Sequence, residues 1–391
     1  MRVLIAHPHI GVGGAEKHVV YTAYNLALLG HEVAVMTLSV EDLDKMPPVA
    51  RKVRFVEPAT PMPRLTSATP LKLVRRMAEE LLSMARLTLQ LAERFDVVVP
   101  FNFPAYWCSP VLKRVKPVVW VCCEVFGAYR QAREWYYANA FFKAAIDAAS
   151  RLDKLVVKQG VTSIVTVSHL NRRLIRARYG RSSEVVYPGV DCSLYLKAGL
   201  DARRRFGLED RFILLHVGEL VEVKGHLSSI RALKLLKGDV KNATLVIVGG
   251  GPLKGRLVSE AFKLGVKDSV LFLRGLSEEE LVALYKASDV CLYPVKEQSF
   301  GLVPFEALAA KTPVVVSKYC GAAEVVLKEG IGIVVAPEPT LLAKAVYRLQ
   351  RNPKLASELA LKGFNYTLKN LTWEHYALRV EGILNKALSL K

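Results

Sequence analysis

The chain has 391 residues, of which 51% are hydrophobic, and its 55 Lys and Arg outnumber 36 Asp and Glu to give a formal net charge of +19. This length exceeds what one hydrophobic core holds and predicts two domains, with enough apolar residues to fill both. No apolar run is long enough to cross a bilayer, which argues against a membrane-spanning protein.

The first stretch of the chain reads as a strand, a glycine loop, a helix and a second strand. Residues 3–6 are apolar, Gly13 and Gly14 lie in the loop, and Gly30 ends the helix before a strand at 31–37. This pattern predicts a right-handed βαβ unit with its glycines at the carboxyl end of the first strand. The glycine spacing differs from the G-x-G-x-x-G dinucleotide fingerprint.

Metal and disulfide chemistry are not expected. His7 and His9 flank a proline without further ligands nearby, so they do not predict a metal site. The six cysteines show no C-x-x-C spacing and fall mostly on apolar segments, which predicts small core residues in a reducing compartment. Residues 1–6 read as a strand rather than a signal peptide, and we expect a cytoplasmic location.

The positive charge is concentrated in one part of the chain. Residues 51–200 hold 24 Lys and Arg against 11 Asp and Glu, mainly in segments 71–95, 112–116 and 171–181. The basic residues of a single helix ordinarily lie on its solvent-exposed face and need no partner. Three such segments together favour an anionic partner, either a membrane surface or a phosphate-bearing acceptor. Nucleic acid is a weaker alternative, because few aromatic residues lie among the basic ones and no binding motif is present.

Alternating strand and helix patterns continue to residue 317. The remaining strands of the first domain are predicted at 96–101, 117–123 and 163–168, and residues 185–191 close that domain. Those of the second domain are predicted at 212–218, 243–252, 269–276, 289–295 and 313–317. The longer predicted helices cover 71–95, 127–160, 227–237 and 277–290, and residues 194–210 are expected to form the linker and the entry to the second domain. Ser277 and Glu280 form a capping-box pattern.

A glycine turn and a short helix lie between the strands predicted at 289–295 and 313–317. Gly301 breaks the first strand, and the helix should begin near Leu302 to Pro304. Its free N–H groups would face the carboxyl ends of the strands, where a phosphate is easily held. Glu306 lies in its first turn and could accept hydrogen bonds from neighbouring hydroxyls such as those of a ribose.

This stretch, QSFGLVPFEALAAKTPVVVS, resembles the signature of the retaining glycosyltransferases of family 4, which take a sugar from a nucleoside diphosphate. The opening G-G-A-E, the closing helix at 372–384 and the segments between them match the family in order over nearly the whole chain. The resemblance implies an α/β fold with two Rossmann-like, doubly wound domains facing a central cleft (GT-B). It implies an acceptor domain at 1–192, a donor domain at 193–372 and a helix at 373–391 that crosses back.

Three positions depart from the family pattern. Glu306 matches its second glutamate, but Gln298 replaces the first by its amide. Lys224 is kept, whereas Glu219 stands at the position of the family's arginine. Cys123 and then Glu124 follow a strand that the family continues with a histidine. A carboxylate beside a diphosphate would repel it unless the carboxylate turns away or is paired.

The resemblance also implies residue roles, with Lys224 and Gln298 as catalytic residues and Cys123 and Glu124 on the acceptor side. No metal or cofactor is implied. The implied donor-binding residues are Gly13, Gly14, Gly218, Glu219, Lys224, Arg274, Gly275, Gln298, Phe300, Gly301, Leu302, Val303 and Glu306.

The expected function is transfer of a hexose, with a hint toward mannose from the V-P after F-G-L, from a nucleotide sugar to a lipid-linked or other glycan acceptor. The enzyme would act as a peripheral protein on the inner membrane face. The alternatives are a catalytically silent nucleotide-sugar-binding relative, suggested by the three departures, and a nucleic-acid binder, suggested by charge alone. Few Asn and Gln beside many Lys and Arg hint at a heat-adapted source.

Overall fold

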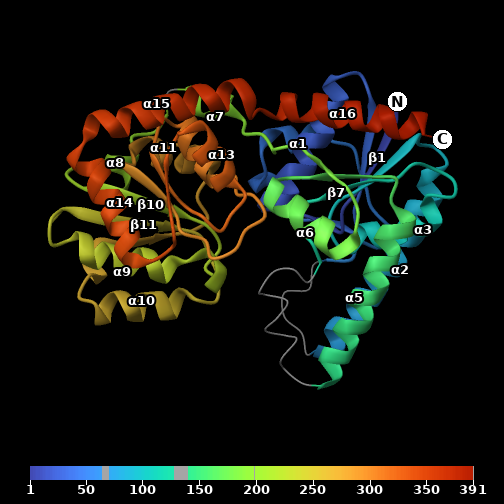
Figure 1. Ribbon diagram of the computed structural model, residues 1–391, viewed down its shortest axis with the longest axis horizontal. Helices are drawn as coiled ribbons and strands as arrows, with labels where there is room; N and C mark the ends of the chain where they lie inside the picture. Colours follow the sequence, from blue (N-terminus) through green and yellow to red (C-terminus); the bar gives the residue numbers. More distant parts are fainter. Residues whose placement is uncertain (64–69, 127–139, 198, 391) are drawn as a thin grey trace. The chain divides into compact units, whose positions relative to one another are not determined.

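The computed structural model describes residues 1–63, 70–126, 140–197 and 199–390. It divides into two compact units, each described here by itself: Met1–Pro188 with Trp373–Lys391, and Gly189–Thr372. The sequence had placed the boundary after residue 192. Figure 1 shows α/β architecture in both units, with parallel strands and covering helices.

The first unit contains a parallel sheet in the order β5-β3-β1-β6 and a second parallel sheet in the order β7-β8-β9. The bridges Val98–Val118 and Phe101–Val121 connect the two sheets between β6 and β7. Its strands are β1 (Arg2–Ala6), β2 (His9–Ile10), β3 (Glu32–Met36), β4 (Ser39–Val40), β5 (Phe55–Val56), β6 (Val97–Pro100), β7 (Val119–Cys122), β8 (Ser163–Thr166) and β9 (Glu184–Val185). Its α-helices are α1 (Gly14–Leu28), α2 (Pro70–Ala92), α3 (Ser109–Leu112), α5 (Ala140–Gly160), α6 (His169–Tyr179) and α16 (Trp373–Ser389). Among its described residues, the 3-10 helices are η1 (Leu43–Lys45), η2 (Pro48–Lys52) and η3 (Ala105–Cys108).

A buried carboxylate ties α5 to the neighbouring elements of this unit. Asp153 is fully buried and accepts hydrogen bonds from the hydroxyls of Tyr106 and Tyr179 and from the indole N–H of Trp107. Arg178 of α6 forms an ion pair with it at 3.2 Å. Because four donors surround the charge, its burial is compensated, and the cluster fixes α5 against α6 and η3.

The second unit is a six-stranded parallel sheet in the order β12-β11-β10-β13-β14-β15. If the strands of this unit are numbered from one to six along the chain, the order is 3-2-1-4-5-6, which is that of doubly wound nucleotide-binding folds. The strand order reverses between β10 and β13. Its strands are β10 (Phe212–Val217), β11 (Ala243–Val248), β12 (Val270–Leu273), β13 (Val290–Tyr293), β14 (Val314–Ser317) and β15 (Ile333–Val335). Its helices are α7 (Cys192–Leu196), α8 (Ala202–Phe206), α9 (His226–Leu236), α10 (Lys254–Lys263), α11 (Glu278–Ala287), α12 (Val303–Ala309), α13 (Ala322–Glu329), α14 (Pro339–Arg351) and α15 (Pro353–Asn370), with 3-10 turns η4 (Glu222–Lys224) and η5 (Lys267–Ser269).

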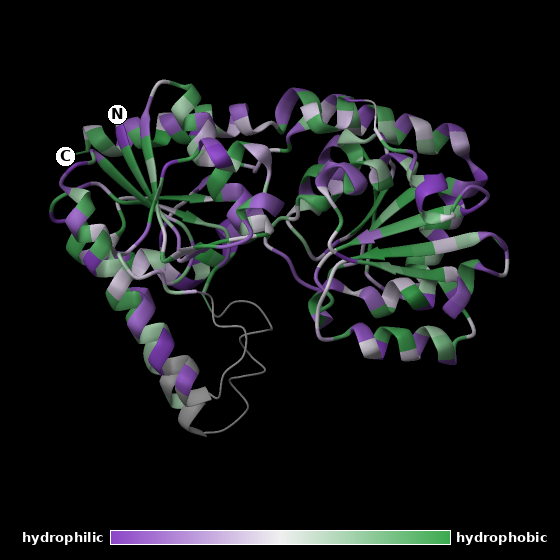
Figure 2. Cartoon of the chain, turned by 180° about the vertical axis from the view of Figure 1, so that it is seen from behind, coloured by the Kyte–Doolittle hydropathy of each residue, from purple (hydrophilic) through white to green (hydrophobic). Residues whose placement is uncertain are grey.

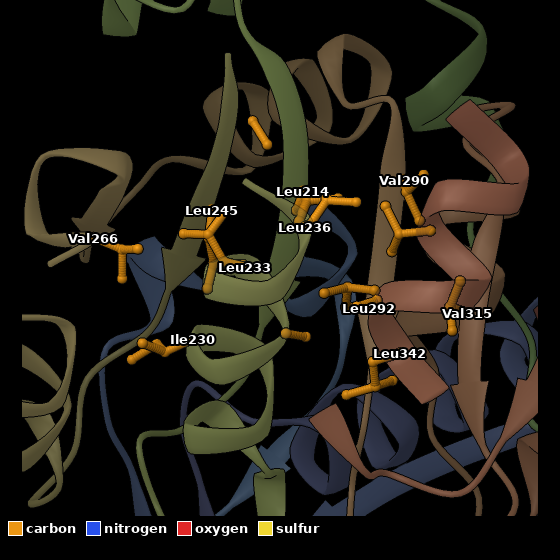
Figure 3. Packing of buried hydrophobic residues seen from close by; sticks show 14 of the residues in the cluster. Leu214, Ile230, Leu233, Leu236, Leu245, Val266, Val290, Leu292, Val315 and Leu342 are labelled. Carbon is orange, nitrogen blue, oxygen red and sulfur yellow. The ribbon is translucent and has the colours of Figure 1, made fainter. Parts of the chain in front are cut away.

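The core of the second unit lies between the sheet and its helices. Figure 3 shows side chains of the strands facing apolar residues of α9 and α14. Most of the strand residues are hydrophobic in both units, as the green arrows of Figure 2 show. Strands that are covered on both faces need such continuous apolar runs. The six cysteines are free and buried, so the sequence was right to treat them as core residues.

The structure confirms most of the predicted elements and changes one. Residues 194–210, predicted as the linker and entry to the second domain, lie within the second unit and contain α7 and α8. Of the predicted helix 127–160, the part from Ala140 is α5, and 127–139 lie outside the described residues. The Ser277–Glu280 capping box is present in both of its hydrogen bonds.

Candidate functional site

Two loops of the second unit, one after β10 and one after β13, are in contact at the point where the strand order reverses. The backbone N–H of Lys296 donates to the carbonyl of Val223 at 2.7 Å. The Lys296 ammonium is also paired with Glu222, which accepts a second bond from Arg256 at 3.2 Å. These contacts hold η4 against the segment after β13. Crevices at such points bind ligands in doubly wound sheets.

Lys224 and Gln298 face each other across these two loops. The Lys224 ammonium donates to Oε1 of Gln298 at 2.6 Å, and both side chains are half-buried. The backbone of Gln298 is fixed as well, since its N–H donates to the carbonyl of Tyr319 and its carbonyl accepts from Gly321. The two residues predicted to be catalytic are therefore in direct contact.

Two glycines let these loops approach closely. Gly225 has φ +77° and a Cβ there would lie 2.0 Å from the carbonyl oxygen of Pro294. Gly301 has φ +109°, and a Cβ there would lie 2.5 Å from the Tyr293 hydroxyl oxygen. Side chains other than hydrogen would be strained at both positions and would push the loops apart. Among the donor-site predictions, the sequence had named Gly301 but not Gly225.

Glu306 lies at the start of α12 and is held by a buried tyrosine. The Tyr285 hydroxyl of α11 donates to Oε2 of Glu306 at 2.7 Å. Tyr285 is fully buried, and burial together with the Glu306 charge raises its pKa well above the usual value, so it stays a hydrogen-bond donor. Sequence reasoning missed Tyr285, although its segment, E-L-V-A-L-Y-K-A-S-D-V, had been matched to the family.

The short helix α12 begins as predicted, with Leu302 as its N-cap and Pro304 in its first turn. Among the described residues, no hydrogen bond is donated by the N–H groups of Gly301, Leu302 and Val303. These donors therefore remain available to an anion beside Glu306. The preceding Phe300 is buried and stacks on Phe305, which packs the turn against the helix.

Two buried histidines, His216 and His226, support the loop after β10. His226 Nε2 donates to the Glu219 carbonyl at 3.0 Å, and its ring stacks on His216 with a centroid distance of 3.9 Å. Burial lowers the pKa of His226 to about 4 and that of His216 well below its usual value, so both rings stay neutral. The side chain of Glu219 is exposed. Its contribution to the loop contacts is its carbonyl rather than its carboxylate.

The other predicted donor-site residues of this unit lie at the same edge of the sheet. Gly218 follows β10 with φ +158°, and Arg274 and Gly275 follow β12. Both residues after β12 are exposed, and Gly275 has φ +67° with no atom within 4 Å of a Cβ built there. Strand ends thus position all three residues, and a Cβ built on Gly218 would lie 3.8 Å from the Lys224 side chain.

The remaining predicted residues belong to the first unit, at the carboxyl ends of its strands. Gly13 is the N-cap of α1, and Gly14 has open space around it. Cys123 follows β7, and its sulfur lies 3.4 Å from Nδ1 of His18. Burial raises the pKa of the Cys123 thiol, and it lowers the pKa of His18 to about 3. This neutral thiol–imidazole contact, with exposed Glu124 beside it, was not foreseen.

His7 and His9 are engaged in ordinary hydrogen bonds. His7 Nδ1 lies 2.8 Å from the His9 carbonyl, and His9 contacts Ser39 and, at 3.2 Å, Glu80 of α2. Within the described ranges, no group of three or more potential metal ligands is found. In those ranges there is also no helix of the length and hydrophobicity that a membrane span requires.

Comparison with protein families gives one match for each half of the chain. Residues 12–194 match the model described as Glycosyltransferase Family 4, and residues 201–365 match Glycosyl transferases group 1. Together these two matches extend over most of the sequence, in the order expected for such proteins.

Two curated relatives illustrate the similarity. A GDP-mannose-dependent alpha-(1-6)-phosphatidylinositol monomannoside mannosyltransferase of Mycolicibacterium smegmatis is 32% identical over 235 residues, which cover 57% of this chain and 62% of that protein. The alignment thus spans less than two thirds of that relative. An uncharacterised glycosyltransferase of Methanocaldococcus jannaschii is 27% identical over 97% of this chain and 96% of its own length.

The fold is shared with solved structures. Sucrose-phosphate synthase of Thermosynechococcus elongatus superposes with a TM-score of 0.82 at 19% identity, covering 100% of both chains. At this identity the likeness concerns the arrangement of helices and strands.

Proposed function

This chain belongs to the glycosyltransferases of family 4 type, and we propose that it moves a hexose, with mannose the first candidate, from a nucleoside-diphosphate sugar to a lipid-linked or other glycan acceptor. One observation carries the proposal. A cation, Lys224, and a carboxylate, Glu306, lie with the open N–H groups of residues 301–303 on the loops where the second sheet changes direction. This set suits a diphosphate and the hydroxyls of a ribose.

The donor would be held by residues of different chemistry. Glu306, fixed at Oε2 by Tyr285, would accept hydrogen bonds from the ribose. Lys224 and the N–H groups of Gly301, Leu302 and Val303 would bind the diphosphate, and Arg274 with Gly275 would border the base. Gln298 would contact the sugar. Gly13 and Gly14 of the first unit would allow its loop to approach the phosphates, with Cys123 and Glu124 on the acceptor side.

The reaction would retain the configuration at the transferred carbon. The acceptor hydroxyl would attack from the face that the diphosphate leaves. Its oxygen would form the new glycosidic bond as the bond to phosphate breaks, and its proton would pass to the departing phosphate oxygen. Lys224 and the N–H groups of the turn would stabilise the negative charge that develops on the leaving diphosphate. Because protein groups would supply this stabilisation, we propose that no metal is required and expect transfer to survive EDTA.

The choice of mannose and of a lipid acceptor is supported by the relative from Mycolicibacterium smegmatis, whose name specifies GDP-mannose and a phosphatidylinositol mannoside. The basic surplus of residues 51–200 supports an anionic membrane as the place of action. We therefore propose a peripheral protein on the cytoplasmic membrane face that meets its acceptor at the lipid surface.

Thermal unfolding with GDP, UDP, ADP and their hexose conjugates tests the donor proposal. Ligand that binds the folded state raises Tm, so one nucleotide series should stabilise the protein. The sugar conjugates of the stabilising nucleotide are then assayed as donors for sugar transfer to a lipid extract with anionic liposomes. Stabilisation by none of the nucleotides would contradict the proposal, and selective stabilisation would exclude the nucleic-acid alternative.

A catalytically silent relative is the second candidate, and the Lys224–Gln298 contact favours it. An amide at position 298 brings no negative charge to an oxocarbenium-like centre. Sugar transfer by the wild type decides between the two. Activity that appears only after Gln298→Glu or Glu219→Arg would establish the silent relative.

A further inference from the structure

The orientation of the Gln298 amide follows from its partner. An ammonium group can only donate hydrogen bonds, so the atom 2.6 Å from Lys224 Nζ must be the amide oxygen. The amide nitrogen then faces the other way. Since the backbone of Gln298 is bonded to Tyr319 and Gly321, the whole residue is held in place before any ligand arrives.

The two N–H groups of this amide have no hydrogen-bond partner in the part of the chain that the structure describes. The side chain is only half-buried, so a ligand can reach them. A glutamate at this position would offer the opposite chemistry, with acceptor atoms and a negative charge. Gln298 thus presents donors where an acid would present acceptors.

Nearby charges reinforce this difference. Lys224 contributes a cation next to the amide. The acid of the same turn, Glu222, is already bonded to Lys296 and Arg256. A ligand group beside Gln298 would therefore meet hydrogen-bond donors and positive charge. Hydroxyls tolerate such surroundings because they can accept, and carboxylates gain most from them because they only accept.

We propose that Gln298 is a specificity residue for the donor, admitting a nucleotide-activated sugar whose group facing the amide is a carboxylate, that is, a hexuronate. The inference rests on the proposed function, because it takes the transferred sugar to lie against Gln298. It extends the donor class from the hexose of the proposed function to the matching hexuronate. A glutamate at position 298 would pair with Lys224 and repel the uronate carboxylate.

Dissociation constants measured by calorimetry for matched pairs test the proposal, using UDP-glucose with UDP-glucuronate and GDP-mannose with GDP-mannuronate. The quantity is the ratio of hexuronate to hexose affinity for the nucleotide that binds. Gln298→Glu should lower this ratio at least tenfold. Gln350→Glu makes the same substitution on α14, which carries none of the site residues, and should leave the ratio unchanged.

A change of less than tenfold in Gln298→Glu, or an equal change in Gln350→Glu, overturns the proposal. If Gln298→Glu does not unfold cooperatively, Gln298→Met is measured instead, since it keeps the length and loses the donors, and its ratio must fall at least fivefold. The free nucleotides UDP and GDP separate this failure from failure of the proposed function. If the proteins bind the free nucleotide but the ratio of hexuronate to hexose affinity does not change, only the specificity role is refuted. If neither the wild type nor any variant binds a free nucleotide, the proposed function is refuted as well.

Discussion

At the scale of single residues, Glu306 illustrates how one contact changes an expectation. From the sequence alone, an early helical position should tolerate alanine. The structure shows that Glu306 accepts the hydrogen bond of a fully buried hydroxyl, that of Tyr285. Removing the carboxylate would leave this hydroxyl unpaired, which costs about 1–3 kcal/mol. The residue therefore has a structural role in addition to its proposed role in the donor site.

Glu306→Ala should accordingly weaken nucleotide binding by about 1–3 kcal/mol and lower the free energy of unfolding by a similar amount. Titration calorimetry with the stabilising nucleotide and urea denaturation measure the two effects.

Glu306→Gln is the matched control, because its amide oxygen can still accept from Tyr285 while the charge is lost. It should keep most of the stability and lose most of the affinity. Unchanged nucleotide affinity in both variants would remove Glu306 from the site, and unchanged stability of Glu306→Ala would show that the Tyr285 contact is dispensable.

At the scale of elements, the turn from η4 into α9 depends on Gly225. This residue has φ +77°, and its α-carbon lies against the Pro294 carbonyl of the loop after β13. The same turn carries Lys224. Any shift that relieves a side chain at position 225 should also move the ammonium away from Gln298.

Gly225→Ala should lower the free energy of unfolding by more than the roughly 1–2 kcal/mol that a left-handed alanine costs, because a backbone clash is added. We also expect donor affinity to fall at least tenfold. Chemical denaturation and nucleotide titration give the two values.

Gly265→Ala is the control, since Gly265 has φ +66° and no atom within 4 Å of a Cβ built there. It should show the left-handed cost alone, with normal donor affinity. Equal losses in the two variants would mean that the close approach at Gly225 does not position Lys224.

At the scale of the whole molecule, the structure changes which basic residues could bind a membrane. On α2, Arg75 and Arg76 form ion pairs with Glu79 and Glu80, so part of the predicted patch is neutralised locally. On α6, the side chains of Arg172, Arg173 and Arg176 are exposed. A cavity of about 350 Å³ lies beside this helix, lined by Arg172, Arg176, Gly180, Arg181 and Ser182.

Replacing Arg172 and Arg173 by alanine should weaken binding to anionic vesicles by about 2 kcal/mol, at about 1 kcal/mol for each basic residue near the surface. The wild type should bind such vesicles at low salt and lose binding steeply as salt rises, because exposed charges are screened. Co-sedimentation across a salt series measures both effects.

Lys344→Ala with Lys354→Ala removes the same charge from exposed positions of the second unit and serves as the control. This pair should bind vesicles like the wild type. If the two double variants lose binding equally, net charge rather than α6 directs the protein to the surface. Equal binding of the wild type to neutral and anionic vesicles would leave α6 an ordinary solvated helix.

The strands and helices were accessible from the sequence because their signals are local. Apolar runs such as PVVVS at 313–317 coincide with β14, and the Ser277–Glu280 pattern coincides with an actual capping box. The two helices within 194–210 were missed because α7 and α8 are each too short to show a helical period. Short helices owe their stability mainly to tertiary packing, which no local pattern reports.

The sequence by itself determined the α/β class, the family and the residue types at the strand ends, because these follow from periodicity and from motifs in a fixed order. Tertiary structure alone decided which groups touch. Lys224 meets Gln298 across 74 positions of the chain, and Asp153 gathers partners from 25 to 47 positions away. Such contacts depend on how strands are ordered in a sheet and on which loops become neighbours, and each pairing is enforced by the cost of leaving a buried polar group unpaired.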